Sequence, residues 1–311
     1  MKAAFIFPGQ GSQYVGMGKD LGAAYPSARE LYERADDTLE LPISRFSFEG
    51  DAETLTATKN AQPAILLHSI VVARILREEG GIEPSIVAGH SLGEYSALVA
   101  AGAVDEMDAL KIVRKRGELM YDAGIKQPGT MAAIIGMERG DVESVCREAA
   151  NGGIVVVANI NSPGQLVISG TVGAVERAMK IALERGAKKT VSLNVSGAFH
   201  SPLVAPAQNE LVEYIRSFLF RDARVGVVCN ADAKAITKKE EIIDALSRQL
   251  TSPVLWSDSM AVLCGRWNGP ILEVGPGKVL AGLLKRIDGA RSVRSVGTTN
   301  EIAQCLAGNA A

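Results

Sequence analysis

The sequence predicts an α/β fold with a mostly parallel sheet and an inserted ferredoxin-like (βαββαβ) subdomain. Three observations support this. Short apolar runs alternate with longer stretches of helical periodicity along the 311 residues, which is typical of parallel strands joined by helices. Residues 130–193 interrupt the alternation with the order strand, helix, strand, strand, helix, strand. The pentapeptide Gly-His-Ser-Leu-Gly at 89–93 stands between one such strand and one such helix.

Residues 3–122 are predicted to form the first strands and helices of the core. An apolar run ended by Pro-Gly predicts a buried strand at 3–7. A second short apolar run predicts a strand at 85–88, directly before the pentapeptide. Apolar residues at helical spacing predict helices at 25–39, 62–78, 94–101 and 105–122.

The middle and the end of the chain supply the other elements. The inserted subdomain is expected to have strands at 130–137, 154–160, 165–170 and 188–193, and helices at 141–150 and 172–185. The core is then expected to resume with helices at 203–218, 240–250 and 279–286 and strands at 225–229 and 271–274. We therefore expect a catalytic core made of residues 1–126 and 194–311, and a ferredoxin-like subdomain made of residues 127–193.

The pentapeptide at 89–93 fits the G-x-S-x-G nucleophile elbow. Its glycines allow a sharp turn without a Cβ clash. Ser91 would then stand at a helix N-terminus, where free N–H groups and the helix dipole favour the negative charge of an acyl intermediate. The alternative is a Gly/Ser loop that only joins a strand to a helix. The strand–turn–helix context favours a serine acyl-transfer or hydrolysis site.

A nucleophilic serine needs a base, and the chain has only three histidines. His68 lies in an apolar helix-like stretch and is expected to be a core residue. His90 precedes the serine on a tight turn, where neighbouring side chains point apart, so we expect it to line the pocket. His200 lies in a loop-like segment, where catalytic groups concentrate. By elimination His200 is the expected base, and a solvated loop histidine is the alternative.

The composition excludes several classes of function. With 33 Lys+Arg against 35 Asp+Glu, no general attraction to nucleic acid or to a membrane is expected. The four cysteines are widely spaced and form no CxxC pair, so we expect isolated buried thiols and no metal site. The apolar residues before Pro8 are too few for a signal peptide, and no apolar run approaches the ~20 residues that span a bilayer. A soluble, cytoplasmic protein is expected.

Several motifs together resemble the malonyl-CoA:acyl-carrier-protein transacylase family. They are FIFPGQGSQ at 5–13, GHSLGEY at 89–95, Arg116, GAFHS at 197–201, QLTSPVLW at 249–256 and EVGPG at 273–277. They occur in family order over essentially the whole chain. The resemblance implies a hydrolase-like core, with the active site in the cleft between this core and the subdomain.

The activity that the resemblance implies is an S-malonyltransferase reaction of fatty acid biosynthesis. A malonyl group would pass from coenzyme A to Ser91 and then to the phosphopantetheine thiol of acyl carrier protein, a ping-pong mechanism without a permanently bound cofactor. One alternative is a serine thioesterase or esterase on a similar core, although no acidic partner for its histidine stands out. Another is a non-enzymatic carrier-docking subunit, which would not need the Ser91/His200 pair.

The resemblance also assigns catalytic roles to residues outside the elbow. It implies that the backbone N–H groups of Gln10 and Leu92 form the oxyanion hole. In place of a carboxylate, the backbone carbonyl of Gln249 would orient His200. Gln10 would also line the pocket.

Substrate recognition is implied for further residues. Arg116 belongs to a basic helical cluster with Lys111, Arg114 and Lys115, and only the resemblance selects it as the residue that binds the malonyl carboxylate. Phe199 and His90 would line the pocket. Because the carrier protein is acidic, we expect docking at basic patches on the subdomain and on the core, represented by Lys189, Lys285 and Arg286.

Overall fold

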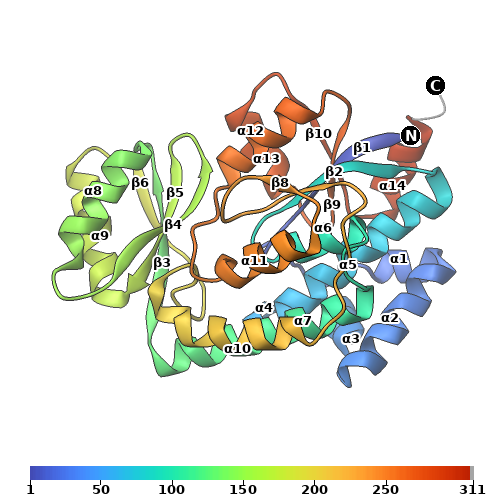
Figure 1. Ribbon diagram of the computed structural model, residues 1–311, viewed down its shortest axis with the longest axis horizontal. Coiled ribbons are helices and arrows are strands. Elements are labelled where there is room, and N and C mark those ends of the chain that lie inside the picture. The colour runs from blue at the N-terminus through green and yellow to red at the C-terminus, as the bar shows by residue number, and fades with distance from the viewer. Residues whose placement is uncertain (309–311) are drawn as a thin grey trace.

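Two β-sheets organise the structure, a computed structural model that describes residues 1–308. The larger sheet has six strands in the order β10-β9-β1-β2-β7-β8, all parallel except the short β8. The smaller sheet has four antiparallel strands in the order β4-β5-β3-β6. It lies to the left in Figure 1, beside the larger sheet and its helices. The predicted fold class is confirmed.

The elements of the core flank the inserted segment in the sequence. The strands are β1 (Lys2–Phe7), β2 (Glu83–Gly89), β7 (Gly226–Val228), β8 (Ala235–Ile236), β9 (Ile271–Val274) and β10 (Val293–Val296). The helices before the insertion are α1 (Lys19–Ala24), α2 (Pro26–Leu39), α3 (Ile43–Glu49), α4 (Ala52–Thr56), α5 (Thr58–Gly80), α6 (Gly93–Ala100) and α7 (Glu106–Lys126). Those after it are η1 (Pro202–Val204), α10 (Ala205–Arg216), α11 (Lys239–Gln249), α12 (Trp256–Arg266), α13 (Val279–Ile287) and α14 (Thr299–Ala307).

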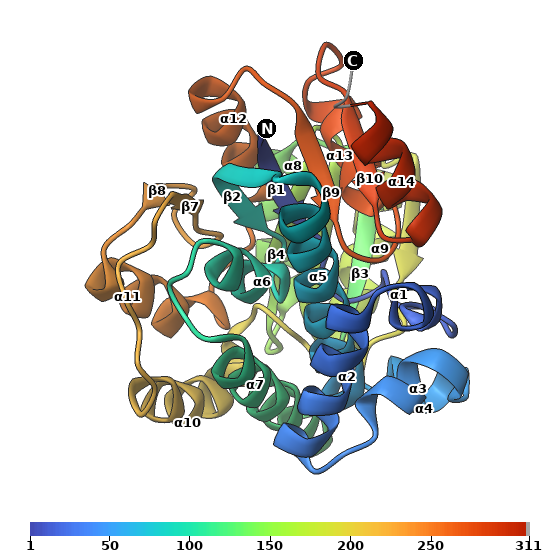
Figure 2. The ribbon, with the colours of Figure 1, turned by 90° about the vertical axis from the view of Figure 1, so that its right-hand side faces the viewer.

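Strand β1 shows how the core is layered. Side chains alternate between the two faces of a strand. Phe5 and Phe7 therefore enter the apolar cluster formed with α5, α6 and α7, whereas Ala4 and Ile6 enter the cluster formed with α12 and α13. Figure 2 shows α5 and α6 on one side of the strands and α12 and α13 on the other. Both faces of the sheet are covered, as expected for a parallel sheet.

The smaller sheet has one face on its helices and one toward the core. Its elements are β3 (Gly129–Ile135), α8 (Arg139–Ala150), β4 (Val155–Ser162), β5 (Gln165–Thr171), α9 (Val172–Glu184) and β6 (Lys189–Ser192). Ile134 and Ile168 pack in a cluster with α8 and α9. Met131, Ala133 and Val167 belong to the main core cluster on the opposite face. The expected βαββαβ order is confirmed.

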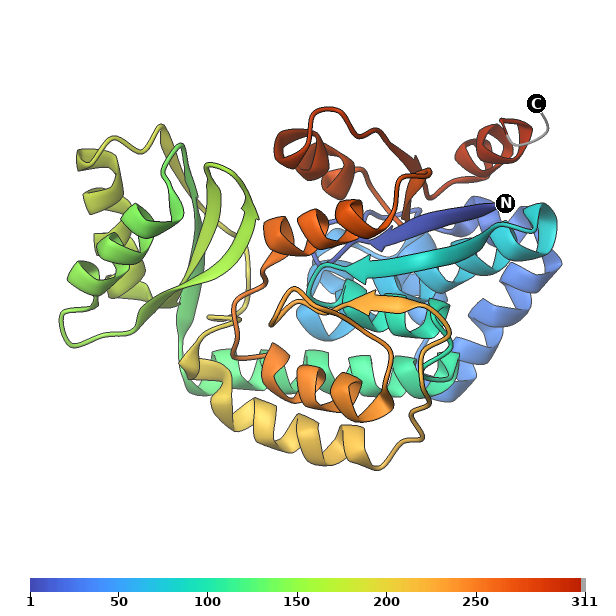
Figure 3. The same ribbon diagram turned by 45° about the horizontal axis from the view of Figure 1, so that its top comes forward.

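Strand β4 attaches the smaller sheet to the core. Ile160 N donates to Val254 O at 2.9 Å, and Val254 N donates to Ala158 O at 2.8 Å. At the neighbouring hairpin, Arg286 of α13 contacts the side chain of Gln165. In Figure 3 the carboxyl ends of the dark blue β1 and the teal β2 point toward the green smaller sheet. A division into domains at residues 126/127 and 193/194 stays a prediction.

Several elements differ from the prediction. Helix α5 begins at Thr58 rather than at residue 62, although it contains Pro63. Proline has no N–H to donate to the carbonyl four residues earlier, and the freed oxygen of Lys59 accepts a hydrogen bond from Arg114 Nη1 instead, at 2.9 Å. The prediction omitted α1, α3, α4, β8, α12, β10 and α14.

The structure also tests the expectations that the cysteines are buried thiols and that no helix spans a membrane. All four cysteines are unpaired; three are buried, as expected, and Cys264 is half-buried. Within residues 1–308, none of the helices combines the length and the apolar character needed to cross a bilayer. The cytoplasmic location stays a prediction.

Candidate active site

The turn between β2 and α6 carries Ser91 in a left-handed backbone conformation, with φ of +50°. A Cβ on Gly89 would lie 1.9 Å from the carbonyl carbon of Gly93, and a Cβ on Gly93 would lie 2.2 Å from the carbonyl oxygen of Phe7. Only glycine fits at either position. The strand–turn–helix context expected for a nucleophile elbow is therefore present, with the serine at its apex.

Ser91 and His200 lie in hydrogen-bonding contact. Ser91 Oγ is 2.9 Å from His200 Nε2. His200 Nδ1 is 3.1 Å from the backbone oxygens of both Gln249 and Ser252. Because carbonyl oxygens only accept, Nδ1 carries the proton and Nε2 presents its lone pair to the hydroxyl. This geometry suits a general base.

The environment of His200 keeps its ring neutral. The side chain is 4% exposed, and the residue has a φ of +56°. Burial, followed by the positive charge of Arg116, lowers the pKa of His200 to about 3. An uncharged imidazole is the form that can accept a proton from a serine hydroxyl.

Arg116 reaches the nucleophile from α7. It is 1% exposed, and its Nη2 donates to Ser91 Oγ at 3.0 Å and to Gln249 Oε1 at 3.2 Å. Its Nη1 donates to Gln62 Oε1 at 2.6 Å, and the guanidinium carbon lies 5.7 Å from the centre of the Tyr95 ring. All these partners are neutral, so a buried cation stands beside the nucleophile without a carboxylate in contact.

Gln10 and Leu92 present backbone N–H groups near the elbow. Neither group donates to another backbone or side-chain atom among residues 1–308. Leu92 directly follows Ser91 at the start of α6. The loop that holds Gln10 lies against the elbow, because a Cβ on Gly9 would be 2.6 Å from the carbonyl oxygen of His90. Two free donors on facing loops are the arrangement an oxyanion hole needs.

His90 points toward the smaller sheet. Its Nε2 is 2.8 Å from Asn161 Oδ1 on β4, and its ring centre is 5.4 Å from that of Trp256. Burial lowers the pKa of His90. This side chain is engaged away from the Ser91 hydroxyl, which leaves His200 as the histidine in reach of that group.

A cavity of about 390 Å³ lies between the two sheets. Its walls come from the elbow, α7, α13 and strands β3, β4 and β5. The residues predicted to act on the substrate all line it: Gln10, His90, Ser91, Leu92, Arg116, Phe199 and His200. Gln249 lies behind them, at hydrogen-bonding distance from Arg116 and His200. Lys189, Lys285 and Arg286 are exposed and lie outside the lining.

The sequence analysis missed residues that hold this site together. Asn230, just after β7, accepts from Ser91 N at its Oδ1 (2.6 Å) and donates from its Nδ2 to Gly89 O (2.7 Å). The side chain of Gln249 donates to Ser91 O at 3.0 Å. One signal could have found Asn230, because it follows a predicted strand and the carboxyl ends of parallel strands gather at the site.

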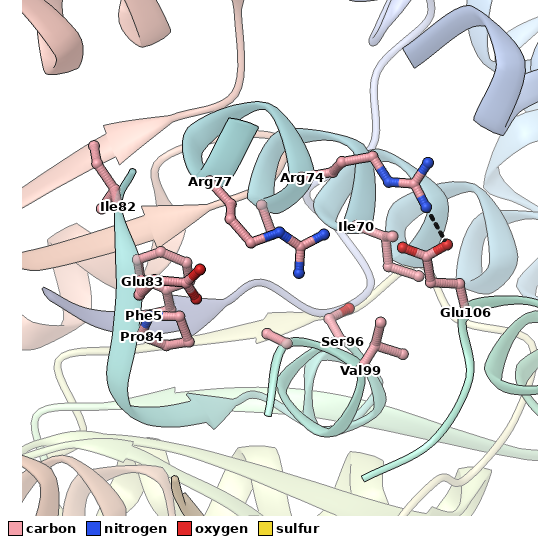
Figure 4. Close-up of a pocket in the computed structure, with 12 residues that line it drawn as sticks. Phe5, Ile70, Arg74, Arg77, Ile82, Glu83, Pro84, Ser96, Val99 and Glu106 are labelled. Atoms are coloured by element: carbon pink, nitrogen blue, oxygen red, sulfur yellow. Dashed lines mark hydrogen bonds and ion pairs between the residues drawn. The ribbon is translucent and has the colours of Figure 1, made fainter. Parts of the chain in front are cut away.

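Two features of the structure lie outside this site. His68 is buried, with its Nε2 2.9 Å from Gly297 O, as expected for a core histidine. A second cavity of about 40 Å³ lies between β2, α5 and α6. Figure 4 shows Ser96 directed into it and Arg74 paired with Glu106. In the part of the chain described, no group of three or more His, Cys, Asp or Glu side chains is placed to hold a metal ion.

The family of the protein follows from comparison with known proteins. The family model described as an acyl transferase domain matches residues 4–301. The chain belongs to the acyl transferase family. The match spans the elbow, both histidines of the cavity and the arginine beside Ser91, so the site just described lies within the matched domain.

The similar proteins share a transacylase description. The chain is 49% identical over 288 residues to the malonyl CoA-acyl carrier protein transacylase of Bacillus subtilis, covering 92% of this chain and 90% of that one. It is 44% identical to the enzyme of the same name from Escherichia coli over 284 residues, 91% and 92% of the two chains.

Solved structures that are similar to this chain carry transacylase descriptions as well. A malonyl-CoA:acyl carrier protein transacylase from Xanthomonas oryzae superposes with a TM-score of 0.95 at 41% identity, covering 98% of each chain. A malonyl-transacylase in complex with a type II PKS acyl-carrier protein superposes with a TM-score of 0.96 at 40% identity, covering 99% of this chain and 100% of the other.

Proposed function

We propose that the protein transfers a malonyl group from coenzyme A to the phosphopantetheine thiol of an acyl carrier protein. The observation that carries the proposal is the buried Arg116, whose Nη2 lies 3.0 Å from Ser91 Oγ. A guanidinium at this distance from the nucleophile can bind the free carboxylate of an acyl group while its thioester carbon meets the hydroxyl. The transacylase names of the similar proteins support the same reaction.

The first half-reaction acylates Ser91. Its Oγ forms a bond to the thioester carbonyl carbon as the hydroxyl proton moves to His200 Nε2. The negative oxygen that results is stabilised by the N–H groups of Gln10 and Leu92. The carbon–sulfur bond then breaks, and the coenzyme A thiolate leaves with the proton from His200. Phe199, which lines the cavity, forms part of its wall beside the reacting atoms.

The second half-reaction deacylates Ser91. The phosphopantetheine thiol gives its proton to His200 Nε2 and attacks the ester carbon, and Ser91 Oγ leaves with that proton. The backbone carbonyl of Gln249 fixes the histidine tautomer throughout. A carbonyl stabilises imidazolium less than a carboxylate would, yet it leaves the ring in the correct orientation.

A thioesterase on the same core is the alternative, and nothing favours it. Both Nδ1 partners of His200 are carbonyl oxygens, whereas hydrolases of this type orient the histidine with a carboxylate. The relatives described above carry transacylase names.

The proposed function is tested by loading the enzyme with malonyl-CoA and then adding either holo carrier protein or buffer. We expect a malonyl adduct on Ser91, seen by mass spectrometry, that persists in buffer and discharges onto the carrier thiol. Rapid loss of the adduct in buffer, at a rate that carrier protein does not increase, would establish hydrolysis instead.

Replacement of Arg116 by alanine is expected to reduce malonyl loading while sparing acetyl loading. Removing one partner of a buried charge pair costs roughly 2–5 kcal/mol, which is a loss of about 30- to several-thousand-fold in the loading rate. An acetyl group has no carboxylate to pair with Arg116, so its loading should not suffer this loss. Rates of loading from the two thioesters measure this. Lys111→Ala is the matched control, because Lys111 is an exposed cation on the same helix. Equal losses for both acyl groups would assign Arg116 a structural role.

We further propose that carrier protein docks on basic residues at the two sides of the cleft. Lys189 is exposed on the edge strand β6, and Lys285 and Arg286 are exposed near the end of α13. Arg286 already contacts Gln165, so Lys189 and Lys285 are the better probes. Their attraction for an acidic partner is screened over ~8 Å at physiological salt.

Charge reversal at both lysines (Lys189→Glu with Lys285→Glu) is expected to raise the KM for carrier protein several-fold at low salt, because electrostatic steering acts on association. Loading from malonyl-CoA should not change. The control is Lys2→Glu, an exposed lysine at the start of β1, at the opposite end of the strands from the cleft. An unchanged KM at low salt would exclude this docking surface.

A further inference from the structure

Glu94 is a buried carboxylate that the two half-reactions do not use. It lies in the first turn of α6 and is 2% exposed. Burial raises its pKa to about 7. It is not among the residues that line the 390 Å³ cavity, so it is not placed to touch a substrate there. An ionisable side chain held this deep is destabilising unless it is well partnered, and its partners show what it does.

The partners of Glu94 are the two residues that hold the elbow. Its Oε2 accepts from Gln249 Nε2 at 2.8 Å and from Asn230 N at 3.1 Å. Gln249 Nε2 also donates to Ser91 O, and Asn230 Oδ1 accepts from Ser91 N. Glu94 Oε2 therefore links Gln249, which binds the carbonyl of Ser91, to Asn230, which binds the N–H of Ser91.

The contact with Glu94 also decides which way the Gln249 amide faces. A glutamine amide can exchange its oxygen and nitrogen by a half-turn. Here Nε2 faces two acceptors, Glu94 Oε2 and Ser91 O, so Oε1 faces Arg116 and accepts from its Nη2 at 3.2 Å. The reverse orientation would set the amide oxygen against a carboxylate and the amide N–H against a guanidinium. Both contacts would be repulsive.

The charge of Glu94 complements this geometry. Desolvation lowers the pKa of Arg116, and Tyr95 together with the ionised form of Glu94 acts against that effect. The Gln249 amide bridges the two side chains, because it donates to Glu94 and accepts from Arg116. A direct ion pair would occupy the guanidinium, whereas the bridge leaves Arg116 Nη2 beside Ser91 Oγ.

We propose that Glu94 is a positioning residue of the transfer reaction: it holds the Gln249 amide so that Arg116 stays aligned with a carboxylated acyl group. This inference rests on the proposed function. Its consequence is that a residue outside the cavity sets the preference for malonyl over acetyl groups.

The test compares Glu94→Ala with Glu94→Gln for loading of Ser91 from malonyl-CoA and from acetyl-CoA. A glutamine oxygen can accept both hydrogen bonds that Oε2 accepts now, whereas alanine accepts neither. Loss of a hydrogen bond to a charged group changes an equilibrium or rate constant by about 10- to 150-fold. We expect Glu94→Ala to lower the malonyl-to-acetyl ratio of kcat/KM by a factor in that range, and Glu94→Gln to restore most of the ratio.

The control is Glu273→Gln, another buried carboxylate, whose oxygens accept from the backbone N–H groups of Leu280 and Ala281. This change is expected to lower the thermal unfolding midpoint and to leave the malonyl-to-acetyl ratio at the wild-type value. A change in the malonyl-to-acetyl ratio therefore reports on the position of Arg116, whereas a general loss of stability changes only the unfolding midpoint.

An unchanged malonyl-to-acetyl ratio in the Glu94→Ala enzyme would overturn the inference. If that variant does not fold, Glu94→Asp replaces it, because its shorter side chain draws the oxygen away from Gln249, and an unchanged ratio is again decisive. Failure of the wild-type enzyme to load malonyl groups at all would instead refute the proposed function, so the two failures are distinguishable.

Discussion

Replacement of Ser91 by alanine is expected to abolish the acyl-enzyme and to reduce transfer by about 10⁶-fold, the scale seen when a serine nucleophile is removed. Ser91 Oγ is the hydroxyl that His200 Nε2 faces at 2.9 Å and to which Arg116 donates at 3.0 Å. Without it, the thioester carbon meets no nucleophile. The measurement is the intact mass of the protein after incubation with malonyl-CoA, together with the rate of carrier malonylation.

The matched control for this experiment is Ser96→Ala. Ser96 lies on α6, is 1% exposed, and has a hydroxyl without a hydrogen-bond partner in the described chain. It lines the small cavity of Figure 4 rather than the large one. Loss of one buried hydroxyl on this helix should therefore leave acylation intact. A malonyl adduct on the Ser91→Ala protein would place the nucleophile elsewhere.

The second large effect is expected at His200. Its replacement by alanine removes the group that takes the proton from Ser91 Oγ, and a positioned base contributes about 10²–10⁴-fold. Arg116 still donates to the serine oxygen, and the free N–H groups of Gln10 and Leu92 remain, so slow acylation should persist. Single-turnover loading of Ser91 from malonyl-CoA measures the remaining rate.

The same measurement on His90→Ala separates the two histidines of the cavity. His90 binds Asn161 on β4 rather than Ser91, so its removal should change loading by a much smaller factor than removal of His200. Near-normal loading by the His200→Ala enzyme, with a large loss in His90→Ala, would reverse the assignment of the base.

The parts of the fold that the sequence could predict are those with a strong local pattern. Strand β1 is a continuous apolar run ended by Pro-Gly, and helices α2 and α7 have long apolar periodicity; their predicted ranges differ from the structure by a few residues. Strand β10 is a four-residue edge strand with only one fully buried side chain, and such a pattern is too short to distinguish from a loop. Helix α14 did have a signal, since Thr298 and Glu301 are spaced as in a capping box and Thr298 accepts from Glu301 N.

The residues of the site also fall into those that a local sequence pattern could predict and those that it could not. Ser91 could be predicted because the elbow is local in sequence, and His200 because few histidines compete. Asn230 had a weak signal, since it follows a predicted strand, although its contact with Ser91 joins residues more than 100 positions apart. The role of Glu94 could not be predicted, because it depends on contacts with Asn230 and Gln249, which lie equally far along the chain. No acidic residue stood out as a partner for His200, and the structure agrees, since the buried Glu94 reaches this histidine only through Gln249.

The backbone at Ser91 and His200 has a consequence for selection and engineering. Both residues have positive φ, a conformation that is unfavourable by roughly 1–2 kcal/mol for a residue with a Cβ and that glycine adopts freely. At Ser91, a small side chain that is only half-buried, glycine would relieve the strain and remove the nucleophile at once, whereas at His200 the loss of a buried ring would cost more than the strain. A library screened for thermal resistance alone would therefore favour inactive proteins at Ser91. Any stabilisation campaign on this scaffold must couple each round to a catalytic readout.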